Sequence, residues 1–406
     1  MHLMDFITDK TKALQYAERY VNNGSLRGSS HKNTTSINTS PFGDTPSFFL
    51  NYCTASPEFF KEFGNIPDWA MRGNNWIFIH PDMTSRNDLN NSVYKTGTFT
   101  KYSVVPTSSG RTVQFLGSEH SDYIKLHYDS ILARDNRSLP FDIAVAGPEI
   151  CKILQAGITN GVLPEEFSMF PEIGARAMKS LSGKEWGMIW RSSKIAGQRS
   201  NQIKILIPLF SLFSNDKKSP DTPSLLFQLL SEVAKDPHTF VLDKILIPII
   251  KIYFSALSQV GIQLELHAQN ALLGLSDSFD PVGIVIRDLS DAGKDLSLIK
   301  EIGADSDFFS STYKCINRFQ TDYQMIHSYM FDFRIGEYIL EPIIKEASDH
   351  GFVDREKIIS DIKNLVKQEL TKLPEYIFPK DGSWYTYNHQ FDAIQPYTQH
   401  PFPRFR

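Results

Sequence analysis

Apolar and polar residues alternate along much of the first third of the chain, and this pattern predicts strands. The runs at 76–79, 96–105, 111–117 and 123–128 are rich in Thr, Val, Ile, Tyr and Phe, the residues that strands prefer. Residues 22–47 are rich in Asn, Ser, Thr and Gly and hold too few apolar residues to be buried, so we expect a loop. That loop is either a solvated connection or a cover over a substrate.

Apolar residues recur with the helical period elsewhere in the chain. The segments with this spacing are 5–21, 147–157, 164–181, 223–235, 240–259 and 354–371. A β-hairpin is expected at 262–288, between the last two helices. The predicted class is therefore α+β, with a β-rich region at 1–140 and a mostly helical region at 141–406.

The hairpin at 262–288 concentrates polar side chains that could carry chemistry. In its first strand, period-two alternation puts Gln263, Glu265 and His267 on one face. The turn at 277–281 then reverses the chain, because Asp, Ser and Pro favour such turns. The alternative interpretation is the water-facing side of an ordinary amphipathic hairpin.

The return strand of the hairpin, 282–286, ends at Arg287 and Asp288, close to the end of the first strand. Carboxylate and amide oxygens suit Mg²⁺, which proteins usually hold with a few carboxylates and substrate phosphates. Glu265, Asn270 and Asp288 are therefore the predicted metal ligands.

A second polar segment, 106–112, reads Pro-Thr-Ser-Ser-Gly-Arg-Thr. Small hydroxyl residues and a glycine let backbone N–H groups approach an anion, and Arg111 adds a charge-assisted donor. The segment lacks the GxxxxGK[ST] pattern of a Walker A loop, and a plain loop is its more common interpretation. Lys125, on the next strand, is either an exposed-face residue or a lysine that reaches nucleotide phosphates.

Composition excludes several classes of function. The 406 residues are 41% hydrophobic and 22% charged, with a net charge of −4 and no long run of one sign, so neither nucleic acid nor an acidic membrane surface is an expected partner. Cys53, Cys151 and Cys315 form no CxxC pair, which argues against disulfides and structural zinc and favours a reducing, cytoplasmic location. The most apolar stretch, 245–257, is too short to span a bilayer, and no signal peptide is apparent at the start.

Taken in order, these segments resemble the IucA/IucC family, the NRPS-independent siderophore (NIS) synthetases. The matching motifs run from about residue 76 to 290 and comprise His80-Pro81-Asp82-Met83 in place of HPWQ, the segment 106–112 for PTxSxRT, Lys125, Arg137, Gly261 to Asn270 for GxxxExHxQN, and Arg287-Asp288 for the strand ending in RD. The ExHxQN motif with the following RD is the specific part of the match, and the other segments support it.

The resemblance implies a cupped-hand fold that uses ATP and Mg²⁺. A carboxylate, often citrate, would attack the α-phosphate to give an acyl-adenylate and pyrophosphate, and an amine or hydroxyl would then displace AMP. The residues implied for phosphate and carboxylate binding are Ser108, Ser109, Arg111, Thr112, Lys125 and Arg137. Those implied for ATP or substrate contacts in the second half are His267, Gln269, Asn270 and Arg287, with Arg191 as a further match to a substrate-binding arginine. Lys125, Arg137 and His267 would be the catalytic residues, and Glu265, Asn270 and Asp288 would hold Mg²⁺.

The chain also departs from the family pattern. HPWQ is replaced by HPDM, and the chain is shorter than usual members, chiefly at the N-terminus. The early HPxxxK motif should lie near 24–32, where Lys32 is present without a preceding His-Pro pair. A lysine–arginine stretch near the C-terminus is not clear either. A member with another substrate and a member without activity both fit these departures.

Two other functions stay open on the sequence. A kinase-like phosphotransferase also combines a His-containing loop, an Asn and a later metal-binding Asp. Against it, the segment 267–270 has no aspartate that could act as the base, and no Gly-rich nucleotide loop is present. The other candidate is a non-catalytic protein that binds a nucleotide or carboxylate. A homodimer is compatible with the sequence.

Overall fold

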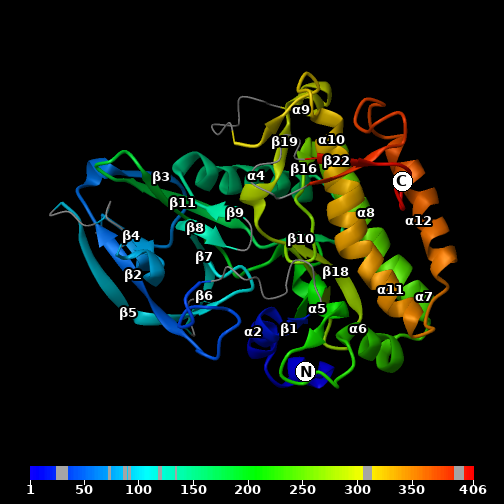
Figure 1. Cartoon of the computed structure of the whole chain (residues 1–406), viewed down its shortest axis with the longest axis horizontal. Helices are drawn as coiled ribbons and strands as arrows, with labels where there is room; N and C mark the ends of the chain where they lie inside the picture. Colours follow the sequence, from blue (N-terminus) through cyan, green and yellow to red (C-terminus); the bar gives the residue numbers. More distant parts are fainter. Residues whose placement is uncertain are drawn as a thin grey trace.

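The computed structural model describes residues 1–23, 35–71, 75–85, 89, 93–117, 121–132, 135–304, 313–387 and 397–406. Lys32 and the place expected for the early HPxxxK motif lie outside these residues. Figure 1 shows a large sheet at one end of the molecule, long helices at the other end and a smaller sheet between them. The α+β class predicted from the sequence is confirmed, whereas the cupped-hand subdivision stays a prediction.

The large sheet has eight strands, and every neighbouring pair in it is antiparallel. In spatial order the strands are β3 (Phe60–Gly64), β11 (Glu172–Lys179), β12 (Glu185–Arg191), β7 (Tyr123–Leu126), β6 (Thr112–Leu116), β5 (Lys95–Pro106), β2 (Phe48–Thr54) and β4 (Trp76–Ile79). The strands predicted before residue 128 are therefore present. Residues 128–132 form a separate strand, β8 (Tyr128–Leu132), which pairs with β9 (Asp135–Arg137).

The helix predicted at 164–181 is wrong. These residues form β10 (Phe167–Met169) and β11. The reason is tertiary, because β11 is hydrogen-bonded to β12 on one side and to β3 on the other, and this pairing outweighs the apolar spacing of the segment. The predicted boundary at residue 140 stays a prediction, although β11 and β12 share a sheet with strands that precede it.

The smaller sheet has five strands, in the order β13 (Ala196–Gly197), β10, β18 (Pro281–Ile286), β17 (Ala271–Leu275) and β14 (Ile205–Pro208). β17 and β18 form a hairpin, and the turn between them contains Phe279 with a φ of 62°. The hairpin predicted at 262–288 is thus correct in its return strand and turn, but its first strand is 271–275 rather than 262–267.

Residues 262–267 belong to a different unit. Ile262–Gln263 is the short strand β16, which pairs with β19 (Gly293–Asp295), and β19 pairs with β20 (Cys315–Ile316). That Gln263 and Glu265 face the same way stays a prediction. Gln263 is buried, and its amide contacts the ring of His327. Because Ile262 and Leu264 are buried as well, this part of the segment has no solvent-exposed face that alternation could reveal.

Helices cover the smaller sheet and the inner side of the large one. In chain order they include α1 (Leu3–Thr8), α2 (Lys10–Tyr20), α3 (Asp68–Met71), α4 (Phe141–Thr159), α5 (Leu209–Phe213), α6 (Leu225–Gln228), α7 (Pro237–Val241), α8 (Ile247–Val260), α9 (Leu296–Glu301), α10 (Tyr323–Ser328), α11 (Glu341–Asp349) and α12 (Arg355–Leu370). A π-helix at Tyr329–Leu340 joins α10 to α11. Two-stranded ribbons form from β1 (Val21–Asn23) with β15 (Asn215–Asp216) and from β21 (Trp384–Tyr387) with β22 (Tyr397–His400).

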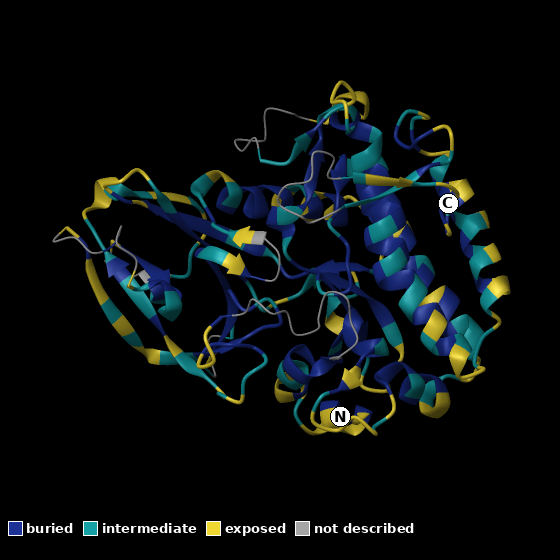
Figure 2. Cartoon of the chain, viewed as in Figure 1, coloured by how far each residue is buried: buried dark blue, intermediate teal, exposed yellow. Residues whose placement is uncertain are grey.

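Two large apolar cores and two smaller apolar clusters hold these layers together. The larger one lies between the helices and the smaller sheet, and α8 contributes much of it. The second is aromatic and lies on the large sheet, where Phe78 contacts Trp76 edge to face and Phe115 at a tilt, and Phe115 stacks on Trp190. Figure 2 shows buried residues running through both cores, including the strands between them. No helix in the described part of the chain is long and apolar enough to cross a bilayer.

Candidate active site

A buried cluster of charged side chains joins the large sheet to the end of β18. Lys125, on β7, is only 2% exposed. Its ammonium donates to Asp288 Oδ1 at 2.7 Å, to Ser290 Oγ at 2.8 Å and to Asp291 Oδ2 at 3.0 Å. An ammonium has three N–H groups, so this one short turn after β18 accepts all of them.

Arg191, on β12, connects the same turn to β11. Its Nη2 donates to Asp288 Oδ1 at 2.8 Å and to Glu172 Oε1 at 2.7 Å. The other oxygen of Glu172 accepts the backbone N–H of Ser290 at 3.1 Å. Burial raises the pKa of Glu172, and the cations Arg191 and Lys125 oppose that rise. Gly147, on α4, leaves the room for this carboxylate, since a Cβ there would lie 1.9 Å from Glu172 Oε2.

Asp288 has an uncommon backbone conformation, with a φ of 69° in the left-handed region, which aspartate tolerates better than most residues. Burial alone would raise the pKa of its carboxyl group. Lys125 and Arg191 outweigh burial and hold the pKa of Asp288 well below its ordinary value. The pKa of Asp291 is also held well below its ordinary value against burial, by Lys125 first and then by Lys314 and Arg111. Both carboxylates are therefore ionised over the whole physiological range.

The segment 106–112 connects β5 to β6 and lies beside this cluster. Ser109 Oγ accepts the backbone N–H of Thr112 at 3.0 Å, and Gly110 has a φ of 75°, so the segment turns tightly. Arg111 is buried, and its Nη1 donates to the backbone carbonyl of Arg137 at 2.7 Å. Burial and the charge of Arg137 lower the pKa of Arg111, while Asp291 and Asp288 act in the opposite direction.

Glu18, on α2, ties the segment 106–112 to the end of the β17–β18 hairpin. Its Oε2 accepts the backbone N–H of Ser108 at 2.8 Å, and its Oε1 accepts from Arg287 Nη1. Ser108 Oγ also accepts from Gln269 at 3.2 Å and from Arg287 Nη2 at 3.4 Å. The structure therefore brings Ser108, Gln269 and Arg287 together. The carboxylate of Glu18 accepts hydrogen bonds from two of these residues, Ser108 and Arg287.

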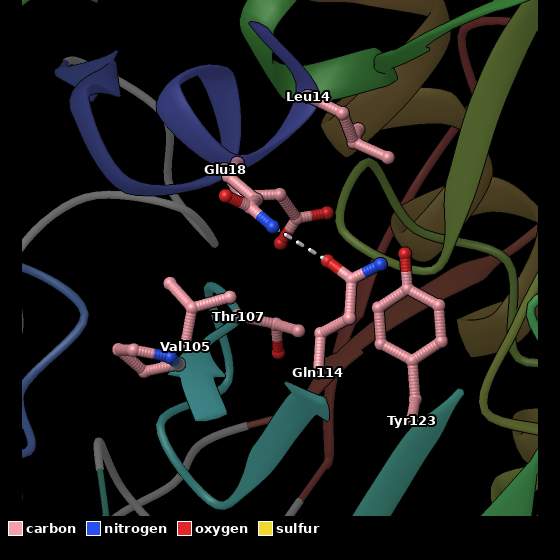
Figure 3. A pocket seen from close by; sticks show the side chains of 8 residues that line it. Leu14, Glu18, Val105, Thr107, Gln114 and Tyr123 are labelled. Carbon is pink, nitrogen blue, oxygen red and sulfur yellow. Dashed lines mark hydrogen bonds between the residues drawn. The ribbon is translucent and has the colours of Figure 1, made fainter. Parts of the chain in front are cut away.

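A pocket opens next to Glu18, between α2 and the strands β5, β6 and β7 (Figure 3). It is lined by Leu14, Gln15, Glu18, Val105, Pro106, Thr107, Gln114 and Tyr123. The Gln15 amide donates to Gln114 Oε1 at 3.0 Å across it. Helix α2 thus forms one wall of this pocket.

The segment 265–270 is a compact turn that precedes β17. His267 Nδ1 accepts the backbone N–H of Gln269 at 3.2 Å, and the carbonyl of His267 accepts from the backbone of Asn270 at 2.9 Å. The Asn270 amide donates to the carbonyl of Glu265 at 3.3 Å. The Glu265 carboxylate pairs with Arg334 at 3.2 Å and lies 4.0 Å from the ammonium of Lys314.

The predicted metal ligands do not form a ready-made cage. Among the described residues, no three or more His, Cys, Asp or Glu side chains gather in a way that could hold a metal ion. Mg²⁺ needs only one or two carboxylates when substrate phosphates supply the rest. Asp288 and Asp291 meet that requirement, since both contact one point, where the cationic ammonium of Lys125 lies. Glu265 and Asn270 contribute no oxygen to that point, and their role as ligands stays a prediction.

Several residues of this region were missed by the sequence reasoning. They are Glu18, Glu172, Ser290, Asp291, Lys314 and Arg334. The sequence does offer a signal for Asp291, because this second carboxylate lies only three positions after Asp288. Glu18 and Glu172 had none, since they come from a helix and a strand that approach the site only after folding.

Comparisons with known proteins decide the fold. No family model matches the sequence, and no curated protein matches it. Among solved structures, the ATP-bound aerobactin synthetase IucA of Klebsiella pneumoniae superposes with a TM-score of 0.74 over 99% of this chain and 80% of that chain, at 14% identity. The chain has the NIS-synthetase fold.

Two further NIS synthetases agree with this result. The petrobactin biosynthesis protein AsbB of Bacillus anthracis superposes with a TM-score of 0.74, covering 98% of this chain and 76% of its own, at 14% identity. The aerobactin synthetase IucC of K. pneumoniae gives a TM-score of 0.66 over 89% of this chain and 70% of its own, at 15% identity. The family resemblance predicted from the sequence is confirmed at the level of the fold.

Proposed function

We propose that this chain is an ATP-dependent ligase that joins a carboxylate to an amine or hydroxyl, as in siderophore biosynthesis. The observation that carries the proposal is the match over 99% of the chain to an ATP-bound aerobactin synthetase. It is supported by the buried cluster around Lys125, Arg191 and Asp288, which joins β7 and β12 to the Arg287-Asp288 motif, and by the contact of Ser108 with Arg287. Buried charges are costly to keep, and such clusters are concentrated at functional sites.

The reaction that fits these residues begins with attack of a substrate carboxylate oxygen on the α-phosphorus of ATP. Pyrophosphate leaves, and an acyl-adenylate remains. The nucleophile then forms a bond to the carbonyl carbon, gives up its proton to solvent, and AMP leaves with one former carboxylate oxygen. The substrate class is a di- or tricarboxylate of the citrate type.

The side chains divide into donors for the phosphates and donors for the carboxylate. Ser108, Ser109 and Thr112 would offer hydroxyl groups and Gln269 its side-chain amide to phosphate oxygens, and Arg111 and Arg287 add charge. Mg²⁺, when bound with ATP, neutralises phosphate charge, and Asp288 and Asp291 would hold it. Arg137, Arg191 and His267 would bind the substrate carboxylate. Donors fixed in advance stabilise the charge that develops at phosphorus without reorganising during the reaction.

Product analysis tests this proposal. The protein would be incubated with ATP, Mg²⁺ and a panel of di- and tricarboxylates, with hydroxylamine as a general nucleophile. We expect AMP and pyrophosphate in equal amounts, dependent on one carboxylate. Formation of ADP would favour the phosphotransferase. Nucleotide binding without turnover would favour a non-catalytic binding protein.

Asp82, which stands where the family pattern HPWQ has a tryptophan, makes several hydrogen bonds in the structure. Asp82 accepts the backbone N–H of Ser36 at 2.7 Å and the hydroxyls of Ser36, Thr39 and Tyr128 at 2.7, 3.2 and 3.0 Å. This carboxylate therefore fixes the segment around Ser36 against the large sheet. The substitution has a role of its own in the fold, so it is not by itself a sign of lost activity.

A further inference from the structure

We propose that Lys125 occupies the divalent-cation position of the nucleotide site and leaves that position when the cation arrives with its nucleotide. This inference rests on the proposed function, because it concerns the regulation of the same site. It assigns Ser290 and Asp291 as cation ligands together with Asp288.

The first argument is the arrangement of oxygens around the ammonium. Asp288 Oδ1, Ser290 Oγ and Asp291 Oδ2 lie 2.7, 2.8 and 3.0 Å from Lys125 Nζ. All three belong to the turn 288–291, which leaves β18 in a left-handed conformation at Asp288. Two carboxylates and a hydroxyl that converge on one point are the oxygen ligands that Mg²⁺, Mn²⁺ and Ca²⁺ accept. Contraction by less than about 1 Å would bring them to the ~2.0–2.1 Å of a magnesium site.

The second argument is electrostatic. A divalent cation cannot share this position with an ammonium, because like charges a few ångströms apart in a buried site repel strongly. Arg191 already lies 2.8 Å from Asp288 Oδ1, and Lys314 lies 3.4 Å from Asp291 Oδ1. These two cations remain to balance the carboxylates after Lys125 leaves. A free divalent ion must displace the ammonium and therefore binds the occupied site only weakly, at high concentration. A divalent ion that brings phosphates gives the ammonium a new anionic partner.

The third argument is the position that Lys125 can reach. On the large sheet, Lys125 of β7 is the registered partner of Thr112 of β6. Directly opposite residues on antiparallel strands have their Cβ atoms about 4.5–5.5 Å apart. A rotation of the lysine side chain therefore transfers its ammonium from the turn 288–291 to the segment 106–112, without moving either strand.

Direct metal binding tests this proposal without the ligase reaction. Free Mn²⁺ would be titrated against the nucleotide-free protein and detected by electron paramagnetic resonance. We expect Lys125→Met to bind one Mn²⁺ at least about tenfold more tightly than the wild type, a gain of about 1.4 kcal/mol. Adding Asp291→Asn should remove that gain. Lys184→Met, which removes an ion pair with Asp129 elsewhere, should behave like the wild type.

The proposal is wrong if Lys125→Met binds Mn²⁺ no more tightly than the wild type, or if the gain survives Asp291→Asn. Lys125→Gln serves as a second variant. If neither variant folds, as judged by circular dichroism, acetylation of Lys125 in the wild type replaces them. Saturating Mn²⁺ should then increase the labelling of Lys125 relative to Lys184, and unchanged labelling would overturn the proposal. Mn²⁺ binding needs no carboxylate substrate, so a failed ligase assay with a tightened Lys125→Met site would refute the proposed function alone.

Discussion

The carboxylate of Glu18 accepts the backbone N–H of Ser108 at 2.8 Å, although the two residues lie 90 positions apart in the chain. The same carboxylate accepts from Arg287, at the end of β18. One side chain of the N-terminal helix α2 thus holds both the segment 106–112 and the β17–β18 hairpin. We infer that Glu18 is a positioning residue, which sets the distance between the two halves of the proposed nucleotide site.

Glu18→Gln should weaken both the fold and nucleotide binding. The amide keeps an acceptor for Ser108 but loses the charge that balances Arg287, and a lost partner of a buried charged group costs about 1–3 kcal/mol or more. Urea unfolding and calorimetric titration with ATP would measure the two effects. Glu165→Gln is the matched control, because Glu165 forms an exposed ion pair with Arg199 and such pairs contribute little. Equal losses in the two variants would contradict the role of Glu18.

Gly147→Ala should disturb Glu172 from within α4. A Cβ at residue 147 would lie 1.9 Å from Glu172 Oε2, so the carboxylate must move away from Ser290 and Arg191. Overpacking of this kind costs about 1–3 kcal/mol, and we expect a lower free energy of unfolding together with lower activity. Gly157→Ala in the same helix is the control, since the Cβ there meets the movable end of Leu163 at 3.0 Å. If both variants unfold at the same urea concentration, the packing argument fails.

Two buried histidines should make the protein sensitive to mild acid. His80 Nδ1 accepts a hydrogen bond from the backbone N–H of Asp82, and His127 Nδ1 accepts one from that of Leu139. An accepting Nδ1 carries no proton, so both imidazole rings are neutral. Burial lowers the pKa of His80 and of His127 to about 4, from 6.5 for an ordinary histidine. Between these values the unfolded chain binds more protons than the folded one, so stability falls as the pH falls from about 6.5 to about 4.

The pH dependence can be assigned by substitution. His127→Gln keeps an acceptor for Leu139 and removes the titrating group, so the slope of unfolding free energy against pH between 4 and 6.5 should become shallower. His350→Gln, at an exposed position, should leave the slope as in the wild type. Urea unfolding at a series of pH values measures both, and an unchanged slope in His127→Gln would show that other groups cause the acid sensitivity.

Lys125→Ala and His267→Ala should each abolish carboxylate-dependent pyrophosphate release while the proteins stay folded. Loss of one donor to a developing charge typically slows a reaction by about 10²–10³-fold. Pyrophosphate release and near-ultraviolet circular dichroism would be measured on the same samples. Full activity in both variants would show that the site has been assigned to the wrong residues.

The sequence predicted the class of fold and most of the strands before residue 128, because alternation and residue preference act locally there. It failed at 164–181, where pairing of β11 with two neighbours decides the structure. It also misplaced the first strand of the hairpin, because Gln263 is buried like its apolar neighbours. Short motifs pointed to Lys125, Arg287 and Asp288 as site residues.

Other parts of the candidate site had no local signal. Glu18 and Glu172 are ordinary residues of an amphipathic helix and a strand, and only tertiary structure brings them to Ser108 and Arg191. Glu265 is the opposite case, because the sequence motif did point to it and predicted it as a ligand of Mg²⁺. In the structure its carboxylate pairs with Arg334 and lies near Lys314, two residues that no motif had pointed to.

Transfer of oxygen from the carboxylate to AMP tests the central claim most directly. The carboxylate found in the product assay would be labelled with ¹⁸O and converted with ATP and an amine, and the AMP would be analysed by mass spectrometry. Attack on the α-phosphorus predicts AMP that carries one ¹⁸O atom in every turnover. Unlabelled AMP, or label that appears in inorganic phosphate beside ADP, would contradict the account.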